Sequence, residues 1–393
     1  YKDKEIESKK INRNFYRIFQ DYSKSIDVDC DAAIKSYNGF YGYISYNSIQ
    51  YFETIKLNAK KAPSEIPDLQ FSFFRFIIAI NHFNDELTLI ENIEKGEESR
   101  IHEIQTLINA RTYGLYKFEA NGEETSNCTD EDFKNNVAKA KQHCKRGDVF
   151  QLVLSRQFQQ KYSGDEFNVY RALRSINPSP YIFYFDYGNF KLMGSSPEAQ
   201  IKIDEEKAII NPIAGTFRRT GDMAQDILLG EKLSKDKKEN AEHVMLVDLA
   251  RNDLSKHASH VQVEVFKEVQ FFSHVIHLVS TVQGKPKGRS IEIVGDTFPA
   301  GTLTGAPKFK AMELIDTYEN QTRGFYGGAV GFIGFDNSVN LAIAIRSFVS
   351  KNNTLFYQAG AGIVINSTEE GELQEVNNKL AALKKALILA EQI

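Results

Sequence analysis

The stretch TDEDFKNNVAKAKQHCKRGDVFQLVLSRQF, residues 129–158, decides the fold because a strand follows a helix in it almost without a break. Thr129 suits a helix N-cap, acidic residues fill the first turn, basic residues fill the last turn, and Gly147 can end the helix. Residues 149–158 then alternate with the period of a strand, with the polar Gln151 among apolar neighbours. A sheet flanked by helices is therefore predicted for the unit that begins here.

The rest of that unit alternates strand-like and helix-like segments. Strands are predicted at 181–186, 190–195, 199–210, 261–282, 325–335, 339–349 and 354–359, and helices at 223–256, 306–318 and 368–391. Strands dominate and helices separate them, a pattern that is typical of layered sheets flanked by helices. We therefore predict an α+β or α/β enzyme domain over residues 130–393.

The first 120 residues form a separate, sheet-containing portion in this interpretation. Aromatic runs at 40–53 and 71–80 predict strands, the charged segment 91–110 has helical spacing, and the polar segment 120–129 is typical of a linker. The chain opens with YKDKEIESKK, which has neither a methionine nor an apolar signal segment. We expect no secretory signal and a truncated N-terminal portion.

Composition excludes several classes of protein. With 393 residues, of which 42% are hydrophobic and 25% charged, the chain has the composition of a soluble globular protein. The net charge of −4 comes from interspersed acids and bases, so neither a nucleic-acid partner nor a membrane partner is expected. No apolar run approaches the ~20 residues of a membrane-spanning helix. The three cysteines lie far apart, which disfavours zinc and disulfides and favours the cytoplasm.

Two acidic pairs with E-x-x-E spacing are candidates for a metal site: Glu239 with Glu242, and Glu372 with Glu375. On a helix, a spacing of three puts both carboxylates on one face. A solvated helix surface is the commoner meaning of any one such pair. Here, however, one pair leads into the apolar HVMLVDLA and the other follows the glycine-rich QAGAGIV. Two such helices that converge would form the oxygen-rich site that Mg²⁺ prefers.

A metal site of this kind suits an anionic substrate, which also needs counter-charges from the protein. Arg346, Lys379 and the backbone N–H groups of Gly360, Ala361 and Gly362 could together hold carboxylates. Each of these signals is weak alone, because the glycines could be turn residues and the arginine could form a structural ion pair.

Other residues offer acid–base and hydrogen-bonding groups. Glu198 follows a predicted strand, where a partly buried carboxyl could act as a general acid, although an exposed loop acid fits the spacing equally well. His274 and His277 share an apolar strand, so one of them is expected to be a hydrogen-bonded core histidine. The segment NPIAGTFRRTGD, residues 211–222, lacks the spacing of a phosphate-binding loop, although Thr216 offers a hydroxyl. The residues alone indicate a Mg²⁺-assisted enzyme that acts on a small polyanion.

Together, the motifs resemble the chorismate-utilising enzymes, and most closely the large synthase subunit, component I, of anthranilate synthase. The resemblance runs from about residue 36 to the end, and its motifs include NPIAGT, KENAEHVMLVDLARNDL, FPAGTLTGAPK, IAIRSF, QAGAGIV and ELQEVNNK. It implies a two-lobed α/β sandwich of layered antiparallel sheets flanked by helices. It also implies a lyase of tryptophan biosynthesis that makes anthranilate and pyruvate from chorismate and ammonia.

The resemblance also assigns roles to individual residues. It implies Mg²⁺ ligands at Glu239, Glu242, Glu372 and Glu375, substrate contacts at Thr302, Tyr326, Arg346, Gly360, Ala361, Gly362 and Lys379, and catalytic positions at Gln151, Glu198, Ala214, Thr216 and His277. In the family, the residue at Glu198 protonates the departing C4 hydroxyl. The residue at His277 assists the elimination of pyruvate.

Two positions imply which nucleophile attacks C2 of the ring. Isochorismate and salicylate synthases have a water-activating lysine where this chain has Gln151, and aminodeoxychorismate synthases typically have a ring-attacking lysine where it has Ala214. Since both lysines are missing, ammonia must come from outside. No G-x-C-x-G nucleophile turn is visible, so the resemblance implies a glutamine amidotransferase partner, component II. An aminodeoxychorismate synthase without the lysine and a catalytically silent chorismate-binding homologue are the alternatives.

A segment outside the predicted site resembles half of the family's tryptophan-inhibition site. Asn177, Pro178, Ser179, Pro180 and Tyr181 match that half, and the given sequence lacks the L-L-E-S-like strand that forms the other. The resemblance implies weak inhibition of this chain by tryptophan. A plain turn between helix and strand is the alternative.

Overall fold

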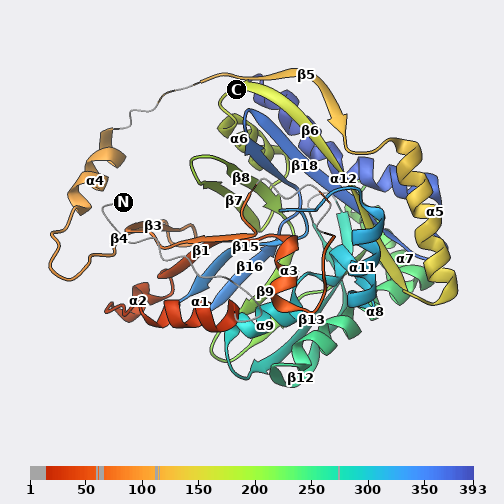
Figure 1. The fold of residues 1–393 in the computed structure, drawn as a ribbon, viewed down its shortest axis with the longest axis horizontal. Helices are drawn as coiled ribbons and strands as arrows, with labels where there is room; N and C mark the ends of the chain where they lie inside the picture. The colour runs from red at the N-terminus through yellow and green to blue at the C-terminus, as the bar shows by residue number, and fades with distance from the viewer. Residues whose placement is uncertain (1–14, 59–60, 62–65, 111–113, 115, 273–274) are drawn as a thin grey trace.

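The computed structural model describes residues 15–58, 61, 66–110, 114, 116–272 and 275–393, and two antiparallel sheets form its frame (Figure 1). The first sheet has nine strands, eight of them in the order β11-β13-β10-β9-β16-β15-β1-β2, with β12 paired to β13. Its strands are β1 (Gly39–Ile44), β2 (Leu69–Ser72), β9 (Ala199–Ile203), β10 (Ala208–Ile210), β11 (Ile213–Arg218), β12 (Ala258–Phe271), β13 (Val275–Pro286), β15 (Ala329–Gly334) and β16 (Val339–Ile343).

The second sheet has seven strands, six of them in the order β14-β6-β18-β17-β8-β7, with β5 paired to β6. Its strands are β5 (Phe118–Ser126), β6 (Gln151–Gly164), β7 (Tyr181–Asp186), β8 (Lys191–Ser196), β14 (Gly305–Ala306), β17 (Ser347–Lys351) and β18 (Thr354–Ile363). A separate hairpin, β3 (Phe76–Asn81) with β4 (Glu86–Glu91), lies with α4 (Ile101–Ala110) to one side of the two sheets (Figure 1).

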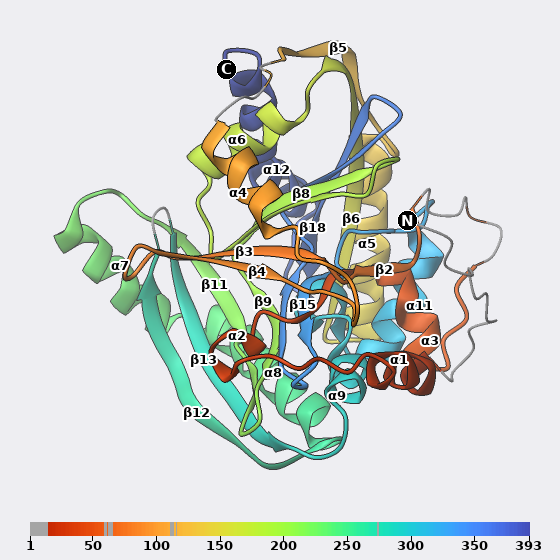
Figure 2. The same cartoon turned by 90° about the vertical axis from the view of Figure 1, so that its left-hand side faces the viewer.

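Helices cover the outer faces of both sheets. The C-terminal helix α12 (Glu369–Ala390) packs on β18 together with α5 (Asp130–Arg146) and α6 (Phe167–Ile176). On the first sheet, α7 (Met223–Lys235) and α8 (Lys237–Ser255) pack against β11, β12 and β13, and Figure 2 shows the long β12–β13 hairpin beside them. The remaining helices are α1 (Phe15–Lys24), α2 (Ala32–Lys35), α3 (Ile49–Phe52) after the 3-10 turn Tyr46–Ser48, α9 (Ser290–Thr297), α10 (Gly301–Thr304) and α11 (Lys308–Tyr318).

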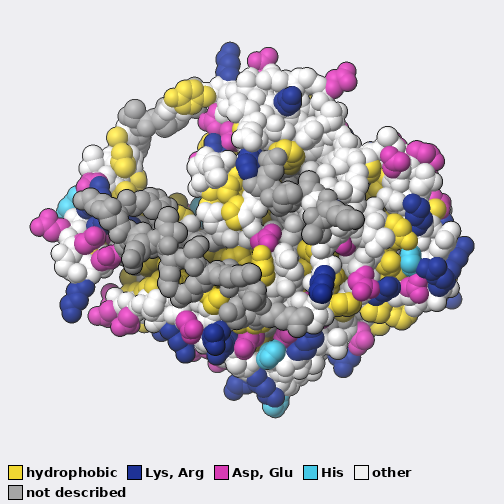
Figure 3. Space-filling view, in the orientation of Figure 1, with side chains coloured by type: hydrophobic (Ala, Val, Ile, Leu, Met, Phe, Trp, Pro, Cys, Tyr) yellow, Lys and Arg dark blue, Asp and Glu magenta, His cyan; other side chains and the backbone are white. Residues whose placement is uncertain are grey.

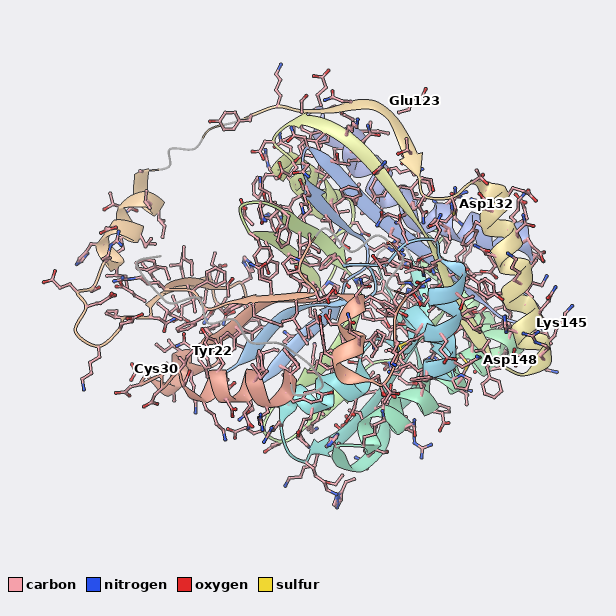
Figure 4. All side chains as sticks on the ribbon, viewed as in Figure 1. Tyr22, Cys30, Glu123, Asp132, Lys145 and Asp148 are labelled. Atoms are coloured by element: carbon pink, nitrogen blue, oxygen red, sulfur yellow. The ribbon has the colours of Figure 1, made fainter. Side chains whose placement is uncertain are left out.

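The helix and strand that open the predicted catalytic unit are confirmed. Thr129 caps α5 through a capping box with Asp132, and Gly147 ends the helix in a left-handed conformation with φ 80°. The labels on Asp132 and Asp148 in Figure 4 lie at the two ends of this helix. The following strand β6 is buried over residues 151–156, because β18 pairs with this part of the strand, β14 pairs with its first two residues, and α5, α10 and α11 pack on β6.

Several other predictions were wrong. Residues 118–126 are not a linker but strand β5, which pairs with β6 at the edge of the second sheet. The aromatic run at 40–53 is a strand only as far as Ile44, and its second half is helical. Helix α4 starts at Ile101, and residues 86–91 form strand β4. Local polarity and aromatic content misled these predictions because strand pairing depends on distant partners.

Strand pairing joins the N-terminal portion of the chain to the rest of the fold. Strand β1 pairs with β15, so the nine-stranded sheet contains strands from both of the portions that the sequence suggested. Figure 3 shows acidic and basic side chains interspersed over the visible face. Within the described part of the chain, no helix has the length and apolar character needed to cross a membrane.

Candidate active site

Helices α8 and α12 carry the four predicted metal ligands near their N-terminal ends. Glu239 and Glu242 lie in the first two turns of α8, and Glu372 and Glu375 lie in the first two turns of α12. The side chain of Asp236 caps α8, and the side chain of Thr368 caps α12. These are the helix ends at which the backbone dipole favours negative charge.

The glutamates of the two helices interact electrostatically across the gap between α8 and α12. Burial raises the pKa of Glu239, Glu242 and Glu372, and the charge of Glu375 raises each of these pKa values further. The Oε2 atom of Glu372 is buried and has no hydrogen-bond partner among the described residues. A set of carboxylate oxygens with one unpartnered acceptor suits Mg²⁺, which prefers oxygen ligands and would relieve this repulsion.

The four carboxylates do not converge closely enough in this structure to form a metal site by themselves. Among the described side chains, no group of three or more His, Cys, Asp or Glu residues is close enough to hold a metal ion by itself. A bound Mg²⁺ therefore requires side-chain movement, oxygen atoms from water, or oxygen atoms from a substrate.

Gln151 connects the second sheet to the carboxylates of α8. Its Nε2 donates a hydrogen bond of 2.7 Å to Oε1 of Glu242, while its own Oε1 is buried and has no partner. A Cβ atom at Gly362 would lie 2.7 Å from the Gln151 Nε2, so the glycine provides the space that this side chain occupies. The two residues are neighbours because β6 pairs with β18.

The predicted substrate-binding glycines are strand residues rather than turn residues. Gly360, Ala361 and Gly362 lie in β18 and pair with residues 153–155 of β6. The Nζ of Lys379 donates to the Gly360 carbonyl at 2.9 Å and forms a 2.7 Å ion pair with Glu375. Lys379 thus joins α12 to the strand that carries the glycines.

Arg346 supplies positive charge at the same place. It follows β16 with φ 51°, and burial lowers the pKa of its guanidinium, partly offset by the charges of Tyr326 and Glu375. Glu375 acts on this guanidinium through its charge, but no described residue is close enough to form an ion pair with it, which argues against a purely structural role. The Tyr326 hydroxyl lies 3.0 Å from the position of a Cβ on Gly360, so the Tyr326 side chain borders the glycine strand. A buried guanidinium without a carboxylate partner is suited to an anionic ligand.

Glu198 has the properties of a general acid. It follows β8, and burial raises the pKa of its carboxyl to about 7, although Thr302 and Lys379 act in the opposite direction. Thr302 Oγ1 donates to Glu198 Oε1 at 3.0 Å. The carboxyl is therefore neither fully exposed nor fully ionised near neutral pH, and it can donate a proton.

Strand β11 carries two predicted residues, Ala214 and Thr216, and passes beside Glu239, while the neighbouring strand β13 carries a third, His277. The segment is a strand, not a loop, and its pairing with β13 is interrupted by a bulge at Gly215, between Ala214 and Thr216. Gly215 has φ 72°, and a Cβ there would lie 3.3 Å from Oε2 of Glu239. Its carbonyl is 2.8 Å from Nδ1 of His277, and the Thr216 hydroxyl is 3.3 Å from the same atom.

These contacts define the state of His277. Since a carbonyl can only accept, Nδ1 carries the proton and Nε2 is left with a lone pair. Burial lowers the pKa of the imidazole, so the ring is neutral near pH 7 and can accept a proton at Nε2. His274, the other histidine considered, lies outside the described residues.

The structure does not bring the segment from Asn177 to Tyr181 to the carboxylates. This segment joins α6 to β7, at the opposite edge of the second sheet from β14 and β6. Asn177 donates through Nδ2 to the Ser195 carbonyl at 3.5 Å, and the hydroxyl of Tyr181 is buried without a partner.

Sequence reasoning missed two sets of charged residues beside the site. The charge of Lys238 lowers the pKa of Glu239, Glu242 and Glu372, against the larger effect of burial. Arg323, paired with Glu319 at 2.6 Å, lies 5.8 Å from the centre of the Tyr326 ring. Lys238 lies in a basic run that gives no separate indication of a site. For Arg323, only the E-x-x-x-R spacing from Glu319 indicates an ion pair.

Comparison with known proteins shows which family the chain is similar to. A family profile described as chorismate binding enzyme matches residues 2–385. The chain is 37% identical over 373 residues to anthranilate synthase component 1 of Aquifex aeolicus, which covers 91% of this chain and 75% of that protein. It is 38% identical over 371 residues to the component 1 protein of Neisseria gonorrhoeae, with 90% and 75% covered.

Solved structures agree with the fold. Anthranilate synthase component I from Streptococcus pneumoniae superposes with a TM-score of 0.79 at 33% identity, covering 88% of this chain and 80% of that chain. The menaquinone-specific isochorismate synthase from Escherichia coli superposes with a TM-score of 0.75 at 21% identity, covering 95% and 82%, and this likeness shows the fold alone. The predicted fold class, layered antiparallel sheets flanked by helices, is confirmed.

Proposed function

We propose that this chain, which belongs to the family of chorismate-binding enzymes, is the synthase subunit of an anthranilate synthase. It is a lyase that converts chorismate and ammonia to anthranilate and pyruvate. The observation that carries the proposal is its likeness to anthranilate synthase component 1 proteins over about nine tenths of the chain, at 37% and 38% identity. The relatives do not favour the aminodeoxychorismate synthase alternative.

Substrate binding follows from the buried positive charge. Arg346, with no carboxylate partner among the described residues, is suited to a carboxylate of chorismate, and Tyr326 and the β18 glycines border the same space. Lys379 lies beside them but is partly neutralised by Glu375. Mg²⁺, when bound by Glu239, Glu242, Glu372 and Glu375, supplies the positive charge that a second substrate carboxylate needs.

The first chemical step replaces the C4 hydroxyl by an amine at C2. The nitrogen of ammonia forms a bond to C2, the ring double bonds shift, and the C4–O bond breaks. Glu198 gives its proton to the departing oxygen, which leaves as water, and the new ammonium group loses a proton to solvent. A carboxyl with a pKa of about 7 is partly protonated at neutral pH, as this step requires.

The second step makes the ring aromatic. His277 takes a proton from C2 while the enolpyruvyl group leaves C3 as enolpyruvate, which takes up one proton and becomes pyruvate. We assign the base role to His277 because its Nε2 has no hydrogen-bond partner among the described residues and its Nδ1–H is held by the Gly215 carbonyl. Hydrogen bonding on one ring nitrogen fixes the orientation of the other.

Ammonia reaches the site from a partner. Neither Gln151, which holds Glu242, nor Ala214 can provide an amine of its own. We propose that a glutamine amidotransferase subunit, component II, supplies ammonia in the cytoplasm, in keeping with the component 1 names of the relatives.

Product analysis tests the proposal. The purified chain is incubated with chorismate, Mg²⁺ and an ammonium salt, and the products are separated by chromatography. Anthranilate and pyruvate in equal amounts are expected. Formation of 4-amino-4-deoxychorismate or isochorismate instead would overturn the assignment, and binding of chorismate without turnover would favour a silent homologue.

A further inference from the structure

A small cavity borders Glu198, and the reaction described above makes no use of it. Its volume is about 40 Å³, and its walls come from α8, α10 and the strands around residues 199–212. Five of the lining residues besides Glu198 have polar side chains: Gln200, Asn211, Asp253, Thr297 and Thr302. The cavity therefore connects the carboxyl of the general acid with other polar groups behind it.

Gln200 is the residue that indicates what fills the cavity. It is 3% exposed, and its Nε2 donates to the Thr297 carbonyl at 3.0 Å. Since a carbonyl only accepts, this contact fixes the orientation of the amide. The Gln200 Oε1 is then a buried acceptor that has no partner among the described residues. Buried polar groups without a protein partner are usually satisfied by ordered water.

The size and the polarity of the cavity suit water. About 10–15 Å³ of space open to a water-sized probe is enough for one molecule, provided that two to four polar partners surround it. The observed 40 Å³ exceeds that requirement, and Gln200, Asn211 and the Glu198 carboxyl offer partners. An apolar cavity of the same size would stay empty.

Charged groups also face the cavity from the neighbouring helices. Asp253 of α8 lines it and forms a 2.6 Å ion pair with Lys308 of α11, whose Nζ also donates to the Thr297 carbonyl at 3.0 Å. Oε1 of Glu198 accepts a hydrogen bond from the Thr302 hydroxyl, and the charge of Lys379 on α12 acts to lower the pKa of the carboxyl. The Oε2 atom of Glu198 is thus the oxygen that can exchange a proton.

We propose that this cavity holds ordered water that returns a proton to Glu198 after each turnover, and that Gln200 positions this water. The inference rests on the proposed function. Glu198 gives one proton to the departing C4 oxygen, and the resulting carboxylate takes one proton from the cavity water, which takes one from solvent. The substrate-derived ammonium releases one proton to solvent, so the protons balance. Gln200 is a positioning residue, because it acts only through the water.

The kinetic test compares two matched glutamine substitutions. Gln200→Met removes the positioning amide, whereas Gln283→Met removes an 8% exposed glutamine on β13 whose Oε1 also lacks a partner and which does not line the cavity. General acid catalysis contributes about 10²–10⁴-fold, and we expect Gln200→Met to lose roughly tenfold of this in kcat. KM for chorismate and for ammonium should stay unchanged.

Two further readouts separate proton return from a structural effect. In Gln200→Met the solvent deuterium isotope effect on kcat should rise, and imidazole added as a small proton donor should restore part of the rate. Gln283→Met should show neither effect. Equal behaviour of the two variants would overturn the proposal. So would a rise in KM for ammonium alone, because the cavity would then carry ammonia.

A structural test does not depend on turnover. A high-resolution crystal structure of the wild-type protein should show water within hydrogen-bonding distance of both Gln200 Oε1 and the Glu198 carboxyl, and Gln200→Met should lose it. A dry cavity in the wild-type protein would overturn the inference. If the wild-type protein made no anthranilate, the proposed function would fail, whereas the water site would still be decided by this experiment.

Discussion

The fold contains two clusters of buried charged side chains. They differ in how many of their polar atoms have hydrogen-bond partners within the protein. In the first, Glu319 accepts hydrogen bonds from the backbone and hydroxyl of Ser155 and from Arg323. Arg323 also donates to the carbonyls of Leu303 and Val153. This pair joins α11, β6 and the segment before Tyr326, and its hydrogen bonds are satisfied inside the protein.

The second group lies between α8 and α12, and several of its polar atoms have no partner. Glu372 Oε2 and Gln151 Oε1 are buried without a hydrogen bond, and Arg346 has no ion pair with any described residue. Buried polar groups that lack partners are uncommon and require an explanation. From this comparison we expect the paired group to support the fold and the unpaired group to bind a ligand that supplies the missing partners.

The sharpest way to test this contrast is Glu372→Ala. The substitution should lower turnover on the order of 10³-fold or more, because Mg²⁺ loses a ligand and several kcal/mol of transition-state stabilisation. The fold should not lose stability, since burial and Glu375 already raise the pKa of this carboxyl. Anthranilate fluorescence, Mg²⁺ titration calorimetry and thermal denaturation measure the three effects.

The matched control is Glu370→Ala on the same helix. The Glu370 side chain is 81% exposed and forms only a 3.6 Å surface contact with Lys134. It should retain full activity and full Mg²⁺ affinity. Normal turnover in Glu372→Ala at saturating chorismate would remove the metal assignment.

Substitutions in the Glu319–Arg323 pair should instead lower the free energy of unfolding. Arg323→Met leaves Glu319 buried without its charge partner, and breaking a buried ion pair typically costs about 3–5 kcal/mol of the free energy of unfolding. Urea denaturation measures this loss. The double variant Glu319→Met with Arg323→Met should recover part of it, because no unpaired charge remains. A single variant as stable as wild type would show that this pair does not support the fold.

Substitution of the general acid should remove the first step and its pH dependence. Glu198→Gln cannot donate the proton, so kcat should fall by about 10²–10⁴-fold. In the wild-type enzyme, kcat should decrease as pH rises through about 7, because the carboxyl loses its proton there. A wild-type rate that rises steadily from pH 6 to pH 9 would contradict this role.

Loss of the elimination base should leave an intermediate behind. His277→Met keeps Glu198 and the carboxylates, so ammonia can still add, and aminodeoxyisochorismate should accumulate. Chromatography of a single-turnover mixture detects it. Anthranilate as the sole product at the normal rate would exclude His277 from the second step.

The smallest effect is expected from Gln151→Lys. A lysine keeps a donor for Glu242 but provides an amine, which should yield a trace of isochorismate if burial lowers its pKa enough to activate water. Glu242 opposes this by favouring the charged amine. The complete absence of isochorismate from the products would contradict the expectation for this position, while leaving the assignment of anthranilate synthase intact.

The sequence predicted elements whose signals are local. Thr129 and Gly147 mark the ends of α5 within the segment itself, and these two positions determined the helix. Strand β5 was not predicted, because its polar residues face solvent at a sheet edge and only the pairing with β6 shows that the segment is a strand. Pro212 and Gly215 interrupt the strand pattern in residues 211–222, which is why no strand was predicted there, yet Gly215 forms a bulge within β11.

In the candidate site, residue types could be predicted but contacts could not. The E-x-x-E spacing placed each pair of glutamates on one helix face. No local pattern indicates that Gln151 bonds Glu242, 91 positions away, or that the bulge at Gly215 holds His277. The cavity behind Glu198 was likewise invisible, because its walls come from segments that meet only in the folded chain.

Helices α8 and α12 belong to different layers, since α8 packs on the nine-stranded sheet and α12 on the seven-stranded sheet. An ion or substrate that both helices bind would therefore link the two layers. A ligand that binds only the folded state stabilises that state, so local unfolding at either helix end should become rarer when it is bound. Amide hydrogens in the first turns of the two helices should then slow their exchange with deuterium together, and only when chorismate and Mg²⁺ are both present.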